Sequence, residues 1–226
     1  MAKIVFSAVV GDARKKVGGV VFTKGRSGAV VRRKVSPVQP RSSFVRNVRA
    51  SFTSISKLWG GSTMDDTKRA AWNALASNYP QKDKFGASHT LTGLQIFQKL
   101  NRVLEQMGTS PILTPPASLA AGYPGAVTVT ATAPSTLTFT CANTIVAAEN
   151  IMIFAGAQVS PGRLAVGNRY RFLDNLPQAA SYDIGAKYVA KFGNLIATKK
   201  VPVLVVCANT TTGAKGTPSS ALKVVS

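Results

Sequence analysis

The chain has 226 residues, of which 45% are hydrophobic and only 16% are charged, and this balance excludes a chain that is disordered throughout. No uninterrupted apolar run reaches the about 18 residues that a membrane-spanning helix needs, and the first residues lack the apolar stretch of a signal peptide. The formal net charge is +20, and residues 1–50 carry over half of it, with twelve Lys and Arg against one acid, Asp12. An excess of this size indicates a polyanionic or acidic partner surface.

Residues 1–40 are predicted to form a basic, extended arm. Two β-type runs, 17–23 and 29–35, flank the glycine-containing segment 24–28, and this arrangement predicts a β-hairpin. Pro37 and Pro40 lack a backbone N–H donor, so we expect segment 36–40 to be a stiff, extended connector.

Residues 41–110 are predicted to form a helical unit of about three helices. The first has Ser42 or Ser43 available as its N-cap, ends at Gly60–Gly61, and carries an apolar stripe at spacings of three and four: Phe44, Val48, Phe52, Ile55 and Trp59. The second is expected to begin at Thr63, acting as N-cap with Asp66 three residues later, and to end before Pro80. Its predicted inward residues are Ala71, Trp72, Leu75 and Ala76.

The third helix is expected to begin near Thr92 and to end at Gly108. Its predicted apolar residues are Leu94, Phe97, Leu100, Leu104 and Met107. A proline-rich linker, 111–118, follows this helix, and the composition then changes to one rich in Thr, Val, Ala and Gly.

Residues 119–226 are predicted to form an immunoglobulin-like or fibronectin-like β-sandwich. Short alternating runs separated by Gly, Pro and Asn predict seven strands, at 126–131, 136–141, 150–154, 170–173, 187–192, 201–208 and 221–225. The expected fold class is therefore α+β, with a hairpin arm and a three-helix unit preceding the sandwich.

No constellation of catalytic residues is found, so we expect neither enzymatic activity nor a cofactor or metal site. His89 has no neighbouring acid or Cys in the sequence and is interpreted as a solvated loop residue. Asp65 and Asp66 are interpreted as acids at a helix start. Cys141 and Cys207 could form one disulfide, but their apolar surroundings favour buried free thiols.

The basic residues of the arm and first helix are the candidate binding site. They could face an anionic partner or form a solvated edge, and the near absence of acids favours the partner. Few aromatic residues lie among them, so stacking on single-stranded bases is not indicated, and no helix has the pattern of a major-groove reader. The candidate residues are Arg14, Lys15, Lys16, Lys24, Arg26, Arg32, Arg33, Lys34, Arg41, Arg46 and Arg49.

Several of these segments resemble a family of small virion-associated proteins of tailed phages and prophages. The similarity lies in the Gly-Gly hairpin 16–22, in Gly28 and Arg32–Arg33, in the Pro-Val-Gln-Pro segment 37–40, and in segments 69–72, 91–97 and 101–102. Gln39 stands where Asn is usual in that family, and 42–44 replaces a more polar stretch. The resemblance implies a role in the virion but no active site.

We therefore expect a non-enzymatic virion structural protein, most simply a minor capsid or cement component present in many copies. Its expected partners are other virion proteins, above all the major capsid protein, whose acidic surface the arm would bind. The chain would be made in the host cytoplasm and would not associate with a membrane. Two alternatives stay open: an architectural protein that contacts packaged DNA through non-specific phosphate contacts, and a tail or adsorption component.

Overall fold

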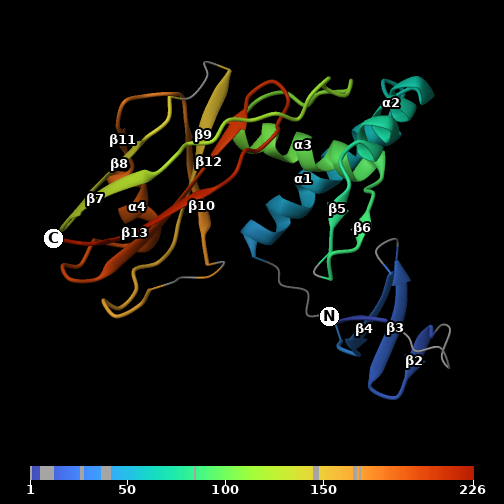
Figure 1. Ribbon diagram of the computed structural model, residues 1–226, viewed down its shortest axis with the longest axis horizontal. Helices are drawn as coiled ribbons and strands as arrows, with labels where there is room; N and C mark the ends of the chain where they lie inside the picture. Colours follow the sequence, from blue (N-terminus) through green and yellow to red (C-terminus); the bar gives the residue numbers. More distant parts are fainter. Residues whose placement is uncertain are drawn as a thin grey trace. The chain divides into compact units, whose positions relative to one another are not determined.

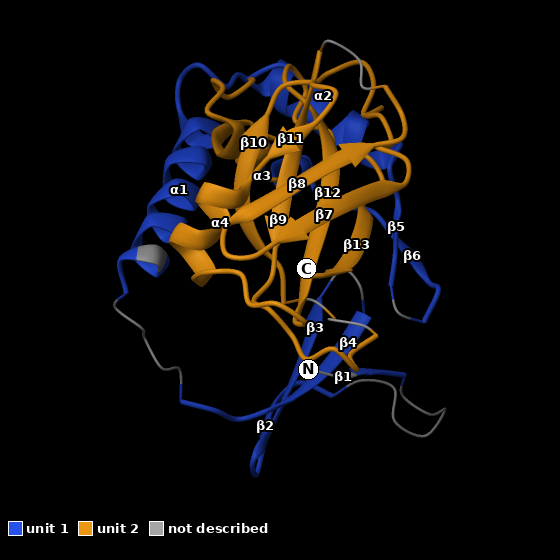
Figure 2. Ribbon diagram, turned by 90° about the vertical axis from the view of Figure 1, so that its left-hand side faces the viewer, with its two compact units in different colours: residues 1–98, 113–115 blue, residues 99–112, 116–226 orange. Residues whose placement is uncertain are grey.

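The computed structural model describes residues 2–5, 13–25, 28–36, 42–83, 85–144, 148–164, 167 and 169–226. Within these ranges the chain forms four helices and thirteen strands, so the fold is α+β, as predicted (Figure 1). Two compact units are present: unit 1 comprises residues 1–98 and 113–115, and unit 2 comprises 99–112 and 116–226 (Figure 2). The division falls within the third helix, between residues 98 and 99, and again within the proline-rich segment, where 113–115 belong to unit 1.

Unit 1 begins with a four-stranded antiparallel sheet, which we call the N-terminal sheet, in the order β1-β4-β3-β2. Its strands are β1 (Ala2–Ile4), β2 (Lys15–Val17), β3 (Val20–Gly25) and β4 (Gly28–Arg33). The predicted hairpin is present, since β3 pairs with β4 from Val20 opposite Arg33 to Gly25 opposite Gly28. The predicted strand 17–23 is interrupted, because Gly18 and Gly19 form a turn between β2 and β3. Gly18 has a φ of 54°, which glycine adopts without a steric penalty.

The first helix, α1 (Ser43–Gly60), begins and ends where the sequence predicts. The Ser42 hydroxyl accepts a hydrogen bond from the Val45 amide at 3.4 Å, and Gly61 follows the last turn. Of the predicted apolar stripe, Ile55 is buried, whereas Phe52 is 45% exposed. Its neighbour Ser51 is buried.

The second helix, α2 (Asp66–Ser77), has Asp65 as its N-cap, so the prediction of Thr63 is wrong. The Asp65 carboxylate accepts a hydrogen bond from the Lys68 amide at 2.7 Å. This hydrogen bond and the nearby Lys68 and Arg69 charges lower the pKa of Asp65. A carboxylate caps as a hydroxyl does and adds a favourable charge at the helix start. Of the predicted inward residues, Trp72, Leu75 and Ala76 are buried, but Ala71 is exposed.

Two short strands, β5 (Gln81–Lys82) and β6 (Ser88–His89), pair as a hairpin before α3 (Gly93–Met107). Thr92 and Gln95 form a reciprocal capping box, each side chain accepting from the other's amide. The Phe97 ring packs against the rings of Trp59 and Trp72, both at 5.3 Å between centroids. The Trp72 indole N–H donates to the Leu113 carbonyl at 2.8 Å, and this cluster forms the core of the helical part of unit 1.

Unit 2 contains two antiparallel sheets (Figure 2). The three-stranded sheet has the order β11-β8-β7, and the four-stranded sheet has the order β10-β9-β12-β13. Their strands are β7 (Val127–Thr132), β8 (Thr136–Cys141), β9 (Glu149–Ala155), β10 (Arg171–Leu176), β11 (Tyr182–Asp183), β12 (Lys200–Asn209) and β13 (Ser219–Val224). Side chains of both sheets meet in one core, which includes Leu137, Phe139, Ile151, Val203 and Val205. The immunoglobulin-like or fibronectin-like assignment stays a prediction.

One of the seven predicted strands is wrong. Residues 187–192 lie in a helix, α4 (Gly185–Phe192), and the short β11 supplies the seventh strand. Tyr188 and Phe192 are four residues apart, and their rings pack at 4.9 Å between centroids on one side of this helix. The Tyr188 hydroxyl also donates to the Gly156 carbonyl at 2.9 Å, which ties α4 to the end of β9.

The other face of the four-stranded sheet has a separate, smaller core. It is formed by Val103 in the second half of α3, Met152 in β9 and Ala208 in β12. Asn101, which is fully buried, donates to the Ile112 carbonyl at 3.1 Å and accepts from the Ile112 amide at 2.6 Å. The last turns of α3 and the chain that follows them are therefore structural parts of unit 2.

Both cysteines are free thiols in unit 2. Cys207 is buried, and burial together with Glu149 and Cys141 raises its pKa to about 12. Cys141 is half-buried, and burial raises its pKa as well. The structure thus agrees with the interpretation that the two residues are not joined.

A candidate basic interface

Most of the predicted binding residues lie on the N-terminal sheet. Arg14 precedes β2, Lys15 and Lys16 lie in β2, Lys24 lies in β3, Arg32 and Arg33 end β4, and Lys34 follows it. All seven are exposed. Arg26 and Arg41 lie outside the described residues.

The strand register distributes these cations over both faces of the sheet. Lys16 and Arg32 both lie opposite Val21, in neighbouring strands, so the three side chains form one row on one face. Arg33 lies opposite Val20, and Lys15 lies opposite Phe22, so these two cations belong to the other face. The register therefore places Arg32 and Arg33 on opposite faces of the sheet.

No described side chain of the N-terminal sheet is buried. Val20, Phe22 and Val31 are half-buried, and Val17 is 65% exposed. A sheet usually gains its stability by covering at least one apolar face. This sheet therefore keeps apolar area available for contact with a partner, and its exposed cations lie beside that area.

The cations of this sheet have few acidic neighbours. Among the described residues, Lys15, Lys16, Arg32, Arg33 and Lys34 form no ion pair through their side chains. Lys3 in β1 does form one, with Asp83 next to β5, and its side chain is only 17% exposed. Sequence reasoning missed Lys3, because nothing local indicates a contact across 80 residues.

Arg46 and Arg49, the two predicted residues on α1, are also exposed. They lie three residues apart and therefore point to neighbouring positions on the helix surface. The acids of unit 1 within the described residues are Asp65, Asp66 and Asp83, and all three have basic partners: Lys68, Arg69 and Lys3.

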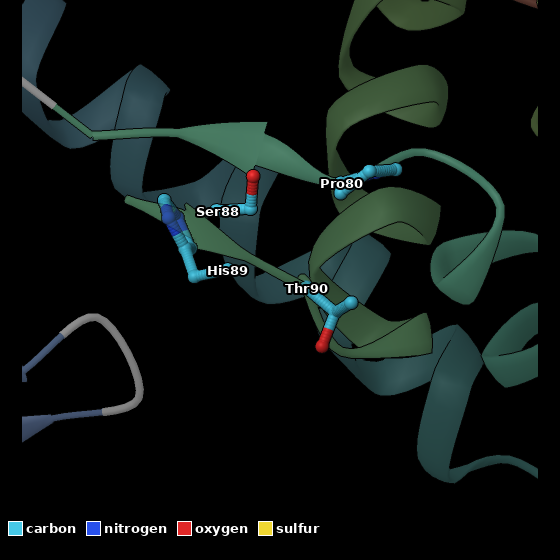
Figure 3. A pocket seen from close by; sticks show the side chains of 4 residues that line it. All are labelled: Pro80, Ser88, His89 and Thr90. Atoms are coloured by element: carbon cyan, nitrogen blue, oxygen red, sulfur yellow. The ribbon is translucent and has the colours of Figure 1, made fainter. Parts of the chain in front are cut away.

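The interpretation of His89 as a solvated loop residue is wrong. It lies in β6 opposite Gln81, it is half-buried, and its Nδ1 atom is buried without a hydrogen-bond partner among the described residues. A hollow of about 300 Å³ lies beside it, lined by Pro80, Ser88, His89 and Thr90. In Figure 3 the imidazole extends away from the hydroxyls of Ser88 and Thr90, so the geometry of a hydroxyl activated by a base is not present there.

In the described part of the chain, no three His, Cys, Asp or Glu side chains gather closely enough to hold a metal ion. No helix in these ranges is both long and apolar enough to cross a membrane.

The N-terminal sheet is thus the candidate functional site, defined by exposed cations next to half-exposed apolar residues. Cations in this setting bind anionic groups by charge, while the apolar residues add contact area that does not depend on salt. Comparison with models of known protein families, with curated proteins and with solved structures finds no match to this chain.

Proposed function

We propose that this chain is a non-enzymatic structural protein of a phage virion, a minor capsid or cement component that binds an acidic shell surface through its N-terminal sheet. The observation that carries the mode of binding is the sheet itself. Five of its cations, Lys15, Lys16, Arg32, Arg33 and Lys34, form no ion pair among the described residues, and its described side chains are all at least partly exposed. The placement in a virion rests on the sequence resemblance of the hairpin and the segments that follow it.

The two kinds of residue on the sheet have separate roles in this proposal. Arg32, Arg33 and Lys34 attract an acidic surface over distances of about 10 Å, and this attraction weakens as salt is added. Phe22 and Val31 become covered on contact, which stabilises the bound state by about 25 cal/mol per Å² of apolar surface removed from water. Many copies on a repeating shell would add avidity to a modest single contact.

The test replaces Arg32, Arg33 and Lys34 by Glu and measures the amount of protein in purified particles by quantitative mass spectrometry. We expect incorporation to fall at least tenfold, because three charges that attract the shell now repel it. The matched control replaces Lys57, Lys199 and Lys223 by Glu, which changes the net charge equally at exposed lysines outside the sheet. We expect the control protein to be incorporated normally.

Three outcomes would count against the proposal. Absence of the wild-type protein from purified particles would rule out the virion role. Equal incorporation of both variants would show that the sheet cations serve only solubility. Retention of the wild-type protein on duplex DNA in low salt, lost in the sheet variant but kept in the control, would identify genome phosphates as the partner instead.

A further inference from the structure

A second concentration of positive charge lies in unit 2, far along the chain from the N-terminal sheet. A hollow of about 640 Å³ is lined by three arginines, Arg163, Arg169 and Arg171, together with Tyr170, Phe192, Ser160 and Gln158 and the apolar residues Ala157 and Val159. None of these nine residues is acidic. This volume is within the range of pockets that hold small organic ligands.

The arginines of this hollow have no internal partner. Within the described part of the chain, none of the three guanidinium groups forms an ion pair or a hydrogen bond through its side chain. The nearest acid in sequence, Asp174, is paired with Lys187. Three uncompensated guanidinium groups around one hollow repel one another, and a bound anion would remove that repulsion.

Arg171 is the first residue of β10, an edge strand of the four-stranded sheet. Arg171 lies opposite Ala155, so both side chains project from the same face of the sheet. Ala155 is fully buried in the shared core, so Arg171 lies at the exposed end of the face that packs on this core. Arg169 lies two residues earlier and lines the same hollow.

The walls of the hollow are fixed by hydrogen bonds. The Gln158 side chain donates to the Asn194 carbonyl at 2.7 Å and accepts from the Ile196 amide at 2.8 Å. Val159 and Lys200 exchange two backbone hydrogen bonds of 2.9 Å, and the Lys200 amine donates to the Arg163 carbonyl at 3.1 Å. A wall held in this way needs little reorganisation when a ligand enters, and this lowers the cost of binding.

We propose that this hollow is a binding site for a small, multiply charged phosphate ligand, with Arg163, Arg169 and Arg171 as its anion-binding residues. Guanidinium groups match phosphate oxygens in geometry, and a tetrahedral phosphate accepts hydrogen bonds from several directions, as three arginines on two segments require. Tyrosine is protonated at neutral pH, and burial raises the pKa of Tyr170 further, so its hydroxyl is available as a hydrogen-bond donor at this hollow. The site goes beyond the proposed virion role and does not depend on it.

The test titrates the full chain with pyrophosphate, ATP and adenosine at physiological salt and follows the heat of binding. We expect one site per chain for pyrophosphate and ATP, and no binding of adenosine. In Arg169→Gln/Arg171→Gln, we expect the affinity to fall at least about tenfold, since each lost charge-assisted hydrogen bond weakens binding by that order. A thermal melt of this variant checks that it remains folded.

The control is Lys57→Gln/Lys223→Gln, which removes the same charge from two exposed lysines that do not line the hollow. We expect it to bind pyrophosphate as the wild-type protein does. Equal weakening in both variants would mean that the ligand follows net charge alone, which would overturn the proposal. No binding to the wild-type protein would also overturn it, and the arginines would then act as inward charges that protect β10, an edge strand, from pairing with another chain.

One additional arm identifies the source of the phosphate. A short single-stranded oligonucleotide with a 5′-phosphate is added as a competitor of pyrophosphate. Competition that disappears when the 5′-phosphate is removed would support a strand end as the ligand. Absence of competition would support a free phosphate compound, provided that pyrophosphate itself binds as expected.

Discussion

The N-terminal sheet and the four-stranded sheet of unit 2 have the same number of strands but opposite surroundings. In β12, the central strand of the second sheet, seven of ten residues are buried. In β3 and β4, the central strands of the first, none of the described residues is buried. Strands alone therefore do not make a core: the second sheet is covered on both faces, by β7, β8 and β11 and by residues of α3, whereas the first keeps its apolar side chains partly in contact with water.

The largest effect expected from this difference concerns two phenylalanines, each in an inner strand of its sheet, one in the core of unit 2 and one in the N-terminal sheet. Phe139 in β8 is 1% exposed and stacks on Tyr182, whereas Phe22 in β3 is half-buried. Phe139→Ala should lower the free energy of unfolding by about 3–5 kcal/mol, the usual cost of a cavity in a packed core. Phe22→Ala should cost about 1 kcal/mol or less, because little contact is lost.

Urea denaturation of both variants, followed by circular dichroism and by tryptophan fluorescence, measures the two effects. The two probes are needed because a chain with two compact units is not expected to unfold in one step. Similar losses in both variants would show that the N-terminal sheet has a core after all, and would weaken its assignment as an interface.

A smaller effect is expected at Asn101, where α3 joins unit 2. Its side chain satisfies both backbone groups of Ile112, so Asn101→Ala leaves a donor and an acceptor without their partner. We expect a loss of about 1–3 kcal/mol in the stability of unit 2, measured by the same denaturation. Gln98→Ala, a change on the same helix at a half-buried hydrogen-bonding residue of unit 1, should leave the unfolding of unit 2 unaltered.

The smallest effect is a difference in thiol chemistry. The thiolate is the reactive form of cysteine, and the raised pKa of Cys207, about 12, leaves very little thiolate at pH 8. A disulfide reagent should therefore label Cys207 more slowly than the half-buried Cys141, and both rates should rise with pH. A cysteine placed on the N-terminal sheet by Val17→Cys should react within seconds, since Val17 is 65% exposed. Rapid labelling of Cys207 in the folded protein would contradict the packing of this core.

Local patterns predicted the parts of the fold that depend on neighbours in sequence. The β3–β4 hairpin, the three longer helices and six strands of unit 2 follow from turn residues, caps and alternation. The prediction of a strand at 187–192 is wrong. The aromatic and β-branched residues of this segment suit a strand, but the hydrogen bond of Tyr188 to Gly156, 32 residues earlier, favours a helix. At Gly18–Gly19 the sequence does contain a turn signal, two adjacent glycines, within the predicted strand 17–23.

The candidate sites also have features that follow from local sequence and features that depend on contacts between distant segments. The number of cations in residues 1–50 can be counted in the sequence. The alternation of side chains along a strand predicts that Arg32 and Arg33 lie on opposite faces of the sheet. The pairing of Lys3 with Asp83 and the meeting of Arg163 with Arg169 and Arg171 depend on how distant segments pack. The local signals of the second site are the basic tip of the turn 160–163 and the Arg-Tyr-Arg spacing of 169–171, and neither shows that these arginines meet.

The sharing of α3 between the two units has a consequence for how this protein can evolve. A domain that ends at a linker can be exchanged between genes by recombination at that linker, and 111–118 has the composition of such a point. Here, an exchange at that point would separate residues 99–112 from unit 2 and expose the apolar surface around Met152 and Ala208. Selection should therefore keep α3 and the two-sheet unit together as one inherited block, whereas the N-terminal sheet can change more freely with the surface it binds.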